Sequence, residues 1–381
     1  MAQSRRLFLK LAGASAVTVV GAGAVFTATR TPVRALVPWE TAMSGAHGDP
    51  RLRALAWAIL APNPHNIQPW LFELVGADEV RIWCDPERRL PATDPFDRQI
   101  TIGFGCMLEQ LRMAAAHAGL AAQITPFPEG AGAPRLDDRP IAHVRFAPAD
   151  AAPDPLFTHA AIRRSDKAPF EDRAIAPDLL GALLEAAAPR HETNLIADTE
   201  GVAALRDLTW RAMEVELRAP APHRESVDLM RIGRAEIEAN PDGIALQGAM
   251  IEALNMAGMI TRETLADPAS TAFSQTLDMM RAQIYSARGF AVLTTPGDTR
   301  AEQLEAGRDW LRLNLAACGL GLGFQPLSQA LQEYEAMAAL YDEAHDRLAP
   351  GGGRVQMIAR LGHGAQPART PRWPLESRMM A

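Results

Sequence analysis

Apolar positions follow helical and strand spacings along most of the chain, and the two kinds of segment alternate. Residues 101–119, for example, form a helical run with apolar residues at Ile102, Leu108, Leu111 and Ala115, and Gly119 can serve as its C-terminal stop. The predicted helices are 50–60, 101–119, 158–167, 177–188, 202–217, 301–318 and 329–340, together with most of 220–285. The predicted strands are 71–84 (a strand or hairpin), 123–127, 141–146, 194–197, 290–295 and 355–361.

Two of these stretches look like copies of each other. Residues 108–125 and 304–324 both have a helix, then a glycine, then a strand. Such a repeat suggests a fold in which each half corresponds to one protomer of an ancestral dimer. We expect a linker at 36–49, a first half at 50–150 and a second half at 151–381.

The second half contains an insert, residues 220–285, that is rich in methionine. Two interpretations stay open. The methionines either pack in the core of amphipathic helices or belong to a lid over a binding site.

The first 35 residues have five basic residues and no acidic residue. Arg5 and Arg6 precede an apolar, Gly/Ala-rich run at 11–26, and small residues follow around Val33-Arg34-Ala35. This pattern resembles a twin-arginine export signal over residues 1–35, with a cleavage point near its end. It predicts the export machinery as a partner and a periplasmic location, or a membrane tether on the outer side.

The composition of the chain argues against two classes of function, nucleic-acid binding and metal binding. The chain has 381 residues, of which 48% are hydrophobic, and its net charge is −7, which argues against a nucleic-acid partner. Cys84, Cys106 and Cys318 form no metal-binding or thiol-exchange spacing, and no metal site is expected.

Three loops carry the candidate chemistry. Pro62–Trp70 has three prolines and two amide side chains suited to the edge of a polar heterocycle, although a rigid turn around Trp70 is the simpler alternative. Arg163–Lys167 gathers three cations and a hydroxyl, which suits a phosphate, and Arg369–Arg372 adds two cations; solvated basic surfaces are the alternatives. The glycines at 319–323 follow a helix, so they indicate a helix end and not a dinucleotide site.

Together and in this order, the loops resemble the nitroreductase family of flavin enzymes, most closely its double-length, Acg-like branch. The resemblance covers residues 50–376. The first loop is similar to the family's PSxxNxQPW segment, and the second to its RRSxR/K element. Further matches are Asp97-Arg98, 307–323 with 326–329, Arg360–Gly362 and Thr370–Arg372. Asn63 and Pro64 stand where the family has serines, and Thr370 where it has a lysine.

The resemblance implies an α+β, nitroreductase-like fold whose two fused halves form an internal pseudo-dimer with FMN between them. The implied FMN-binding residues are Pro62, Asn63, Pro64, Asn66 and Gln68 from the first half and Arg163, Ser165, Lys167, Ser328, Gln329 and Arg372 from the second, with Arg369 able to replace the lysine. Arg163, Ser165 and Arg372 would hold the phosphate. Lys167 would stabilise the negative charge of the reduced ring, and amides near Ser328 would face its reactive nitrogen. No side chain is needed as an acid or base, so no catalytic residue is named.

The leading functional hypothesis is an exported FMN-dependent oxidoreductase that reduces nitro groups, quinones or similar acceptors, with an unidentified electron donor. The alternatives are a non-catalytic protein that sequesters FMN under a lid and an exported scaffold without flavin. Residues 44–60 offer only Arg51 and Arg53 as counterparts of the RRS element, so we expect one FMN per chain. The fusion satisfies the ancestral dimer, which predicts a monomer.

Overall fold

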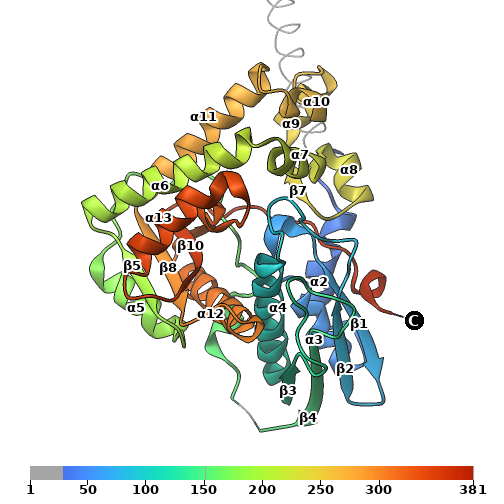
Figure 1. The fold of residues 1–381 in the computed structure, drawn as a ribbon. Coiled ribbons are helices and arrows are strands. Elements are labelled where there is room, and N and C mark those ends of the chain that lie inside the picture. Colours follow the sequence, from blue (N-terminus) through green and yellow to red (C-terminus); the bar gives the residue numbers. More distant parts are fainter. Residues whose placement is uncertain (1–28, 151, 381) are drawn as a thin grey trace, which may run out of the picture.

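The computed structural model describes residues 29–150 and 152–380, and it contains two four-stranded antiparallel sheets (Figure 1). The first sheet has the order β1-β2-β4-β3 and the second the order β5-β8-β10-β9. Every neighbouring pair in both sheets is antiparallel. The strands are β1 (Trp70–Val75), β2 (Glu79–Cys84), β3 (Leu120–Pro126), β4 (Ala142–Pro148), β5 (Thr193–Ile196), β8 (Gly289–Thr295), β9 (Gly323–Pro326) and β10 (Arg354–Gly362).

The two sheets have the same order of strands, taken in the sequence of each half. In each half a helix precedes the first strand, and a long helix joins the second strand to the third. These are α3 (Pro50–Ala58) and α4 (Arg98–His117) in the first half, and α5 (Pro177–Ala187) and α12 (Arg300–Gly319) in the second. The predicted α+β fold of two fused halves is therefore confirmed.

The two halves pack through α4 and α12, which lie side by side in the middle of the molecule (Figure 1). One hydrophobic cluster runs from Phe72 and Phe104 in the first half to Trp310 and Leu361 in the second. Because the halves share this core, neither half could be removed without exposing a large apolar surface.

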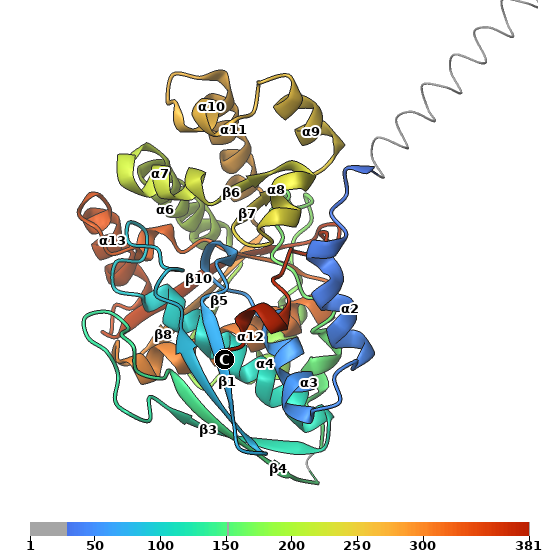
Figure 2. The ribbon, with the colours of Figure 1, turned by 90° about the vertical axis from the view of Figure 1, so that its right-hand side faces the viewer.

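The second half contains a large excursion between β5 and β8, where the first half has only the tight turn 76–78. It starts earlier than the predicted insert and consists of α6 (Thr199–Arg218), α7 (Pro220–Asp228), β6 (Met230–Ile232), α8 (Gly233–Ala239), β7 (Ile244–Leu246), α9 (Ala249–Met256), α10 (Arg262–Ala266) and α11 (Thr271–Tyr285). Its outer helices α9 to α11 project beyond both sheets (Figure 2). Met250, Met256, Met259 and Met279 are exposed, so core packing does not explain these four side chains.

Three local predictions are wrong. The segment 36–49, predicted as a linker, contains α2 (Val37–Ser44), whose Trp39 is fully buried. The predicted helix 158–167 is reduced to a 3-10 turn, Pro155–His159, because backbone groups beyond it bond elsewhere: Asp166 N–H donates to Phe324 C=O at 3.0 Å. The predicted helix 329–340 is replaced by two 3-10 turns, Gln329–Leu331 and Glu335–Met337, before α13 (Ala338–Leu348).

The N-terminal export pattern is only partly visible. Arg5, Arg6 and the apolar run 11–26 lie outside the described residues, whereas Val33–Ala35 lie inside them. Among the residues that the structure describes, no helix is long and apolar enough to cross a membrane.

Candidate functional site

The loop 62–69 has an unusual backbone for its sequence. His65, Asn66 and Gln68 have positive φ values of 45°, 55° and 52°, although none is a glycine. Residues held in this region cost of order 1 kcal/mol each and gather at ligand-binding sites. The loop also lies tightly on α4, where a Cβ on Gly103 would come within 3.2 Å of Asn63 Cβ. The strain and the close packing together mark this loop as a candidate site.

Asn63 and Gln68 use their side chains to hold the loop. Asn63 Oδ1 accepts from Gln68 N–H at 2.8 Å, and Asn63 Nδ2 donates to Ala61 C=O. Gln68 is fully buried; its Nε2 donates to Pro241 C=O at 2.8 Å and its Oε1 accepts from Trp373 N–H at 2.9 Å. These amides therefore shape the loop, and the predicted flavin contacts from this segment are left to its backbone and to its other residues.

Arg372 ties the C-terminal element to the same loop. Its guanidinium donates to Asn66 Oδ1 at 2.5 Å and to the backbone carbonyls of residues 59–61. A further bond to Pro371 C=O completes its five N–H donors. Arg372 thus holds the end of α3 and positions the loop, and it has no donor left for a direct phosphate contact in this arrangement.

Arg163 lies beside it, 3% exposed, and donates to Asn314 Oδ1 at 2.9 Å and to Leu60 C=O at 3.2 Å. Arg164 is 8% exposed, and its guanidinium lies 4.3 Å from the centre of the Trp39 ring. Burial lowers the pKa of Arg163 and of Arg164 to about 10. Burial also lowers the pKa of Arg372, and the charges of the two other arginines lower it further.

We call Arg163, Arg164 and Arg372 the arginine cluster. Among the described residues, no carboxylate forms an ion pair with any of the three, and Arg163 Nε, Arg164 Nε and the neighbouring Asn314 Nδ2 have no hydrogen-bond partner. Buried charges are normally paired, because an isolated ion loses its hydration without compensation. The helix-end carbonyls offset part of this positive charge, and an anion would offset the rest.

Lys167 and Ser165 complete the predicted RRS element. Lys167 is exposed. Burial lowers the pKa of His65 to about 4, and the positive charge of Lys167 contributes a smaller part of this shift. His65 Nδ1 is buried and has no partner in the described part of the chain. His65 was missed in the sequence, where only its place inside the proline-rich loop pointed to it.

The predicted segment at Ser328 and Gln329 meets a buried carboxyl group. Ser328 Oγ donates to Met357 Sδ at 3.5 Å, and Gln332 Nε2 donates to Glu216 Oε2 at 2.7 Å. Glu216, on α6, is 5% exposed, and burial raises its pKa to about 7 against hydrogen bonds from Gln332 and Gln329. Glu216 could not be singled out from the sequence, because it lies in an ordinary helical pattern and its buried environment is formed by residues that are distant along the chain.

Arg369, which we predicted to replace the charge of the family's lysine, forms an ion pair with a surface residue. Arg369 pairs with Glu40 of α2 and is thereby directed to the surface. Its guanidinium also lies 5.8 Å from the centre of the Trp39 ring, and its charge helps to lower the pKa of Arg164.

The insert contacts the loop directly. Gly243 N–H donates to Asn66 C=O, and Asp242 accepts from Arg88 at 2.6 Å, Arg231 at 2.7 Å and Trp373 Nε1 at 2.9 Å. The insert, the loop and the C-terminal tail are therefore joined around one carboxylate.

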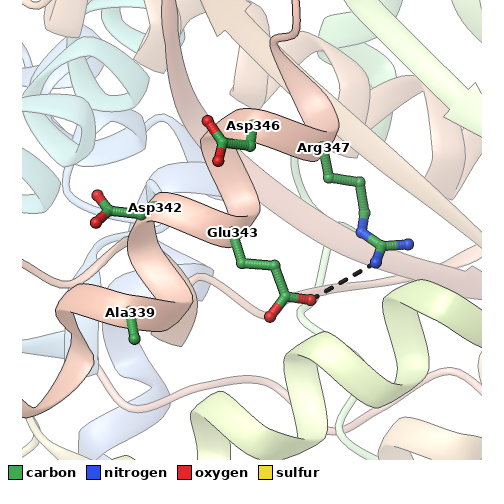
Figure 3. Close-up of a pocket in the computed structure, with 5 residues that line it drawn as sticks. All are labelled: Ala339, Asp342, Glu343, Asp346 and Arg347. Carbon is green, nitrogen blue, oxygen red and sulfur yellow. Dashed lines mark ion pairs between the residues drawn. The ribbon is translucent and has the colours of Figure 1, made fainter.

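A surface pocket elsewhere is lined by Ala339, Asp342, Glu343, Asp346 and Arg347, all on α13 (Figure 3). Glu343 pairs with Arg347 at 3.6 Å, and none of the predicted site residues lines the pocket. Within residues 29–150 and 152–380, no three His, Cys, Asp or Glu side chains are placed to hold a metal ion.

No protein-family model matches the chain, but several curated proteins of Mycobacterium tuberculosis do. The uncharacterized protein Rv3127 is 25% identical over 353 residues, covering 85% of this chain and 91% of the relative. A protein named putative NAD(P)H nitroreductase Rv3131 is 24% identical, and the match covers 81% of this chain and 83% of that protein. This chain is related to nitroreductase-like proteins. The putative NAD(P)H nitroreductase acg is 31% identical, and the match covers 46% of this chain and 49% of that protein.

Solved structures of nitroreductase-like proteins also match. A putative nitroreductase from Anabaena variabilis has a TM-score of 0.40 and 13% identity over 75% of this chain and 69% of that chain. The FMN-dependent nitroreductase NfnB from Mycobacterium smegmatis, solved with NADPH, has a TM-score of 0.36 and 19% identity over 56% of this chain and 92% of that chain.

The resemblance noted in the sequence implies that the predicted site residues of the two halves meet. Hydrogen bonds link Arg163 to Leu60 and Arg372 to Asn66, and Lys167 lies near His65. Ser165, Lys167 and Gln329 Oε1 have no hydrogen-bond partner among the described residues, so they are available to a ligand. Asn63, Gln68, Arg369 and Arg372 are engaged with protein groups instead.

Proposed function

We propose that this protein is an FMN-dependent oxidoreductase that passes electrons to nitro compounds, quinones or similar acceptors. The observation that carries the proposal is the arginine cluster, a buried positive charge without a described carboxylate partner, which is hydrogen-bonded to Leu60 and to Asn66 of the strained loop 62–69. The names of two M. tuberculosis relatives, putative NAD(P)H nitroreductases, support the reaction class. The FMN-dependent structural neighbour adds the same cofactor by name.

The residues present fit a flavin phosphate. Arg163 Nε, Asn314 Nδ2 and Lys167 supply donors that no described acceptor uses, and Ser165 supplies a hydroxyl from the same stretch of chain as Arg163 and Lys167. When bound, FMN supplies the hydride chemistry. Lys167 would offset the negative charge that reduction adds to the ring, and the uncharged His65 would face the same region without adding to that charge.

One FMN per chain is the expected stoichiometry. The second half has only residues 188–192 between α5 and β5, where the first half has the longer loop before β1. In the first half, Arg51 is committed to Asp49 at 2.7 Å and to backbone carbonyls, so it does not act as a counterpart of Arg163.

A second function, sequestration of FMN, is favoured by the contacts of the insert. Pro241, Asp242 and Gly243 bond to the loop and the tail, as a lid would. In this alternative the flavin is held but electron donors and acceptors cannot approach it.

We place this activity outside the cytoplasm, in a monomer exported by the twin-arginine route. The support is the Arg5-Arg6 pattern with the apolar run 11–26, and the core that both halves share. Because NAD(P)H is not freely available there, the electron donor is left open. Replacing both arginines with lysine should keep the protein in the cytoplasm, which cell fractionation measures.

The test begins with the colour and flavin content of the purified full-length protein. The enzyme proposal expects one bound FMN that NADPH or dithionite reduces and a quinone or nitroaromatic reoxidises. Bound flavin that dithionite reduces but no acceptor reoxidises would favour sequestration, and failure to take up FMN would overturn both functions.

Arg163→Ala and Lys167→Ala should each weaken FMN binding about tenfold or more. The control Arg139→Ala, which removes a surface arginine paired with Asp137, should bind FMN like the wild type.

A further inference from the structure

Glu238, on α8 of the insert, binds the backbone at the end of the export pattern. Its carboxylate accepts the N–H groups of Val33 at 2.5 Å, Arg34 at 3.1 Å and Ala35 at 3.1 Å. The Glu238 side chain is 5% exposed. Three consecutive backbone donors are therefore held by one buried carboxylate.

The same segment is held from its other side. Ala35 is 2% exposed, and its C=O accepts from Arg372 N–H at 2.9 Å. Trp39 follows it into the core and donates through Nε1 to Thr370 C=O at 2.8 Å. On the N-terminal side, Arg234 of α8 donates to Thr29 C=O at 2.6 Å. Residues 29–39 are thus fixed between the insert and the C-terminal tail.

The backbone at this junction is turned, not extended. Val33 has φ −118° and ψ −55°, and Arg34–Leu36 form a 3-10 turn. Peptide recognition by strand addition needs an extended segment with free backbone groups and side chains that reach a pocket. Here the backbone is turned, its three N–H groups are occupied and the Ala35 side chain is buried, so this segment cannot add to a protease as a strand.

We propose that Glu238 locks this junction, so that a processing protease does not cut at Val33–Ala35 in the folded chain and the preceding residues stay attached. The consequence goes beyond the flavin chemistry. A protein that crosses the membrane already folded would arrive with the junction closed and would remain joined to its apolar N-terminal segment at the outer face.

Trypsin tests the lock without any export step. The Arg34 side chain is 84% exposed, so trypsin can reach it, but the following bond lies in the locked backbone. In brief digests of the full chain, the bond after Arg34 should stay intact in the wild-type protein, as read by mass and N-terminal sequencing. Glu238→Ala should be cut after Arg34 about tenfold faster or more, because cleavage follows the population of the open segment.

Two further variants separate the lock from general unfolding. Glu238→Gln keeps one acceptor oxygen and should be cut at an intermediate rate. Glu263→Ala removes an exposed carboxylate of the same insert, on α10, and should behave like the wild type. Equal cutting after Arg34 in wild type and Glu238→Ala would overturn the proposal, whether or not the protein binds FMN.

In an exporting host, the mass of the exported protein gives the second reading. The wild type should keep the residues before Val33 and stay with the membrane fraction, whereas part of the Glu238→Ala protein should be released in a shortened form. Wild-type protein recovered with Ala35 or Leu36 as its first residue would overturn the proposal.

Discussion

Gly105 of α4 and Gly307 of α12 meet where the two halves of the molecule cross. A Cβ built on Gly105 would lie 2.9 Å from Gly307 Cα, and one built on Gly307 would lie 2.7 Å from Gly105 Cα. The two helices occupy equivalent places in their halves, so this contact lies near the axis that would relate them. Glycine at both positions lets the helix backbones approach more closely than any side chain would allow.

Gly307→Ala should therefore destabilise the protein strongly. Its Cβ would come 2.0 Å from Ile102 C=O, which forces the helices apart and costs at least about 3 kcal/mol of unfolding free energy. Urea unfolding measures the loss. The control is Gly181→Ala in α5, which has open space around it and should gain about 0.5–1 kcal/mol. Equal effects at the two sites would show that the crossing is not tight.

The repeat of helix, glycine and strand in the two halves could be predicted because it depends on the local sequence pattern of each segment. A helix, a glycine and a strand recur at 108–125 and 304–324, and these segments form α4–β3 and α12–β9. Strands such as β8 also follow from a run of apolar residues that is buried throughout. Periodicity is enough here, because each element buries the face that its own sequence marks as apolar.

Other features depend on partners far away in the sequence. Trp39 is buried by residues that include the tail at 370, and the basic stretch at 163–167 leaves the helical pattern because its backbone bonds to β9. For the same reason, the contacts of Arg372 with backbone carbonyls could not be predicted from the sequence. Its charge and position suggested a phosphate, but only the folded structure shows the three carbonyls at the end of α3 that use its donors.

Trp39 should matter for cofactor binding although it is not expected to touch the cofactor. The guanidinium groups of Arg164, Arg369 and Arg372 lie 4.3, 5.8 and 5.9 Å from its ring centre. Cation–π contacts of this kind contribute about 0.5–2 kcal/mol each. Trp39→Leu should weaken FMN binding about tenfold in a fluorescence titration, provided that the proposed flavin site is correct. Trp39→Phe keeps a ring and loses only the bond to Thr370, so it should bind FMN more tightly than the leucine variant; identical affinities would contradict this role.

Asp242 should couple the insert to the candidate site. Burial raises its pKa, but bonds from Trp373 and Arg88 outweigh it and keep the pKa below the ordinary value. Asp242→Asn keeps the shape and removes the charge that Arg88 and Arg231 share, which should cost about 2–4 kcal/mol. Hydrogen exchange should then speed up together in residues 230–246 and 62–70. Faster exchange confined to the insert would show that the loop is held without it.

Glu216 should make stability fall as pH rises. The native state keeps its proton up to about pH 7, whereas the unfolded chain releases it near the ordinary value of 4.5. Between these values the native state binds more protons, so unfolding becomes easier with increasing pH, by up to about 3 kcal/mol. Glu216→Gln keeps an oxygen that accepts from Gln332 and cannot ionise. Its stability relative to the wild type should therefore rise between pH 4.5 and 8 in urea unfolding.

The control for this pH dependence is Glu343→Gln. Arg211 holds the pKa of Glu343 below its ordinary value, so Glu343 is ionised in both states above about pH 5. Its contribution is lost only as pH falls through the lowered pKa, and the difference between this variant and the wild type should stay constant from pH 5 to 8. A Glu216→Gln difference that is equally constant over that range would mean that Glu216 is already ionised in the folded protein, and that the polar groups around Gln329 stabilise a carboxylate and not a carboxylic acid.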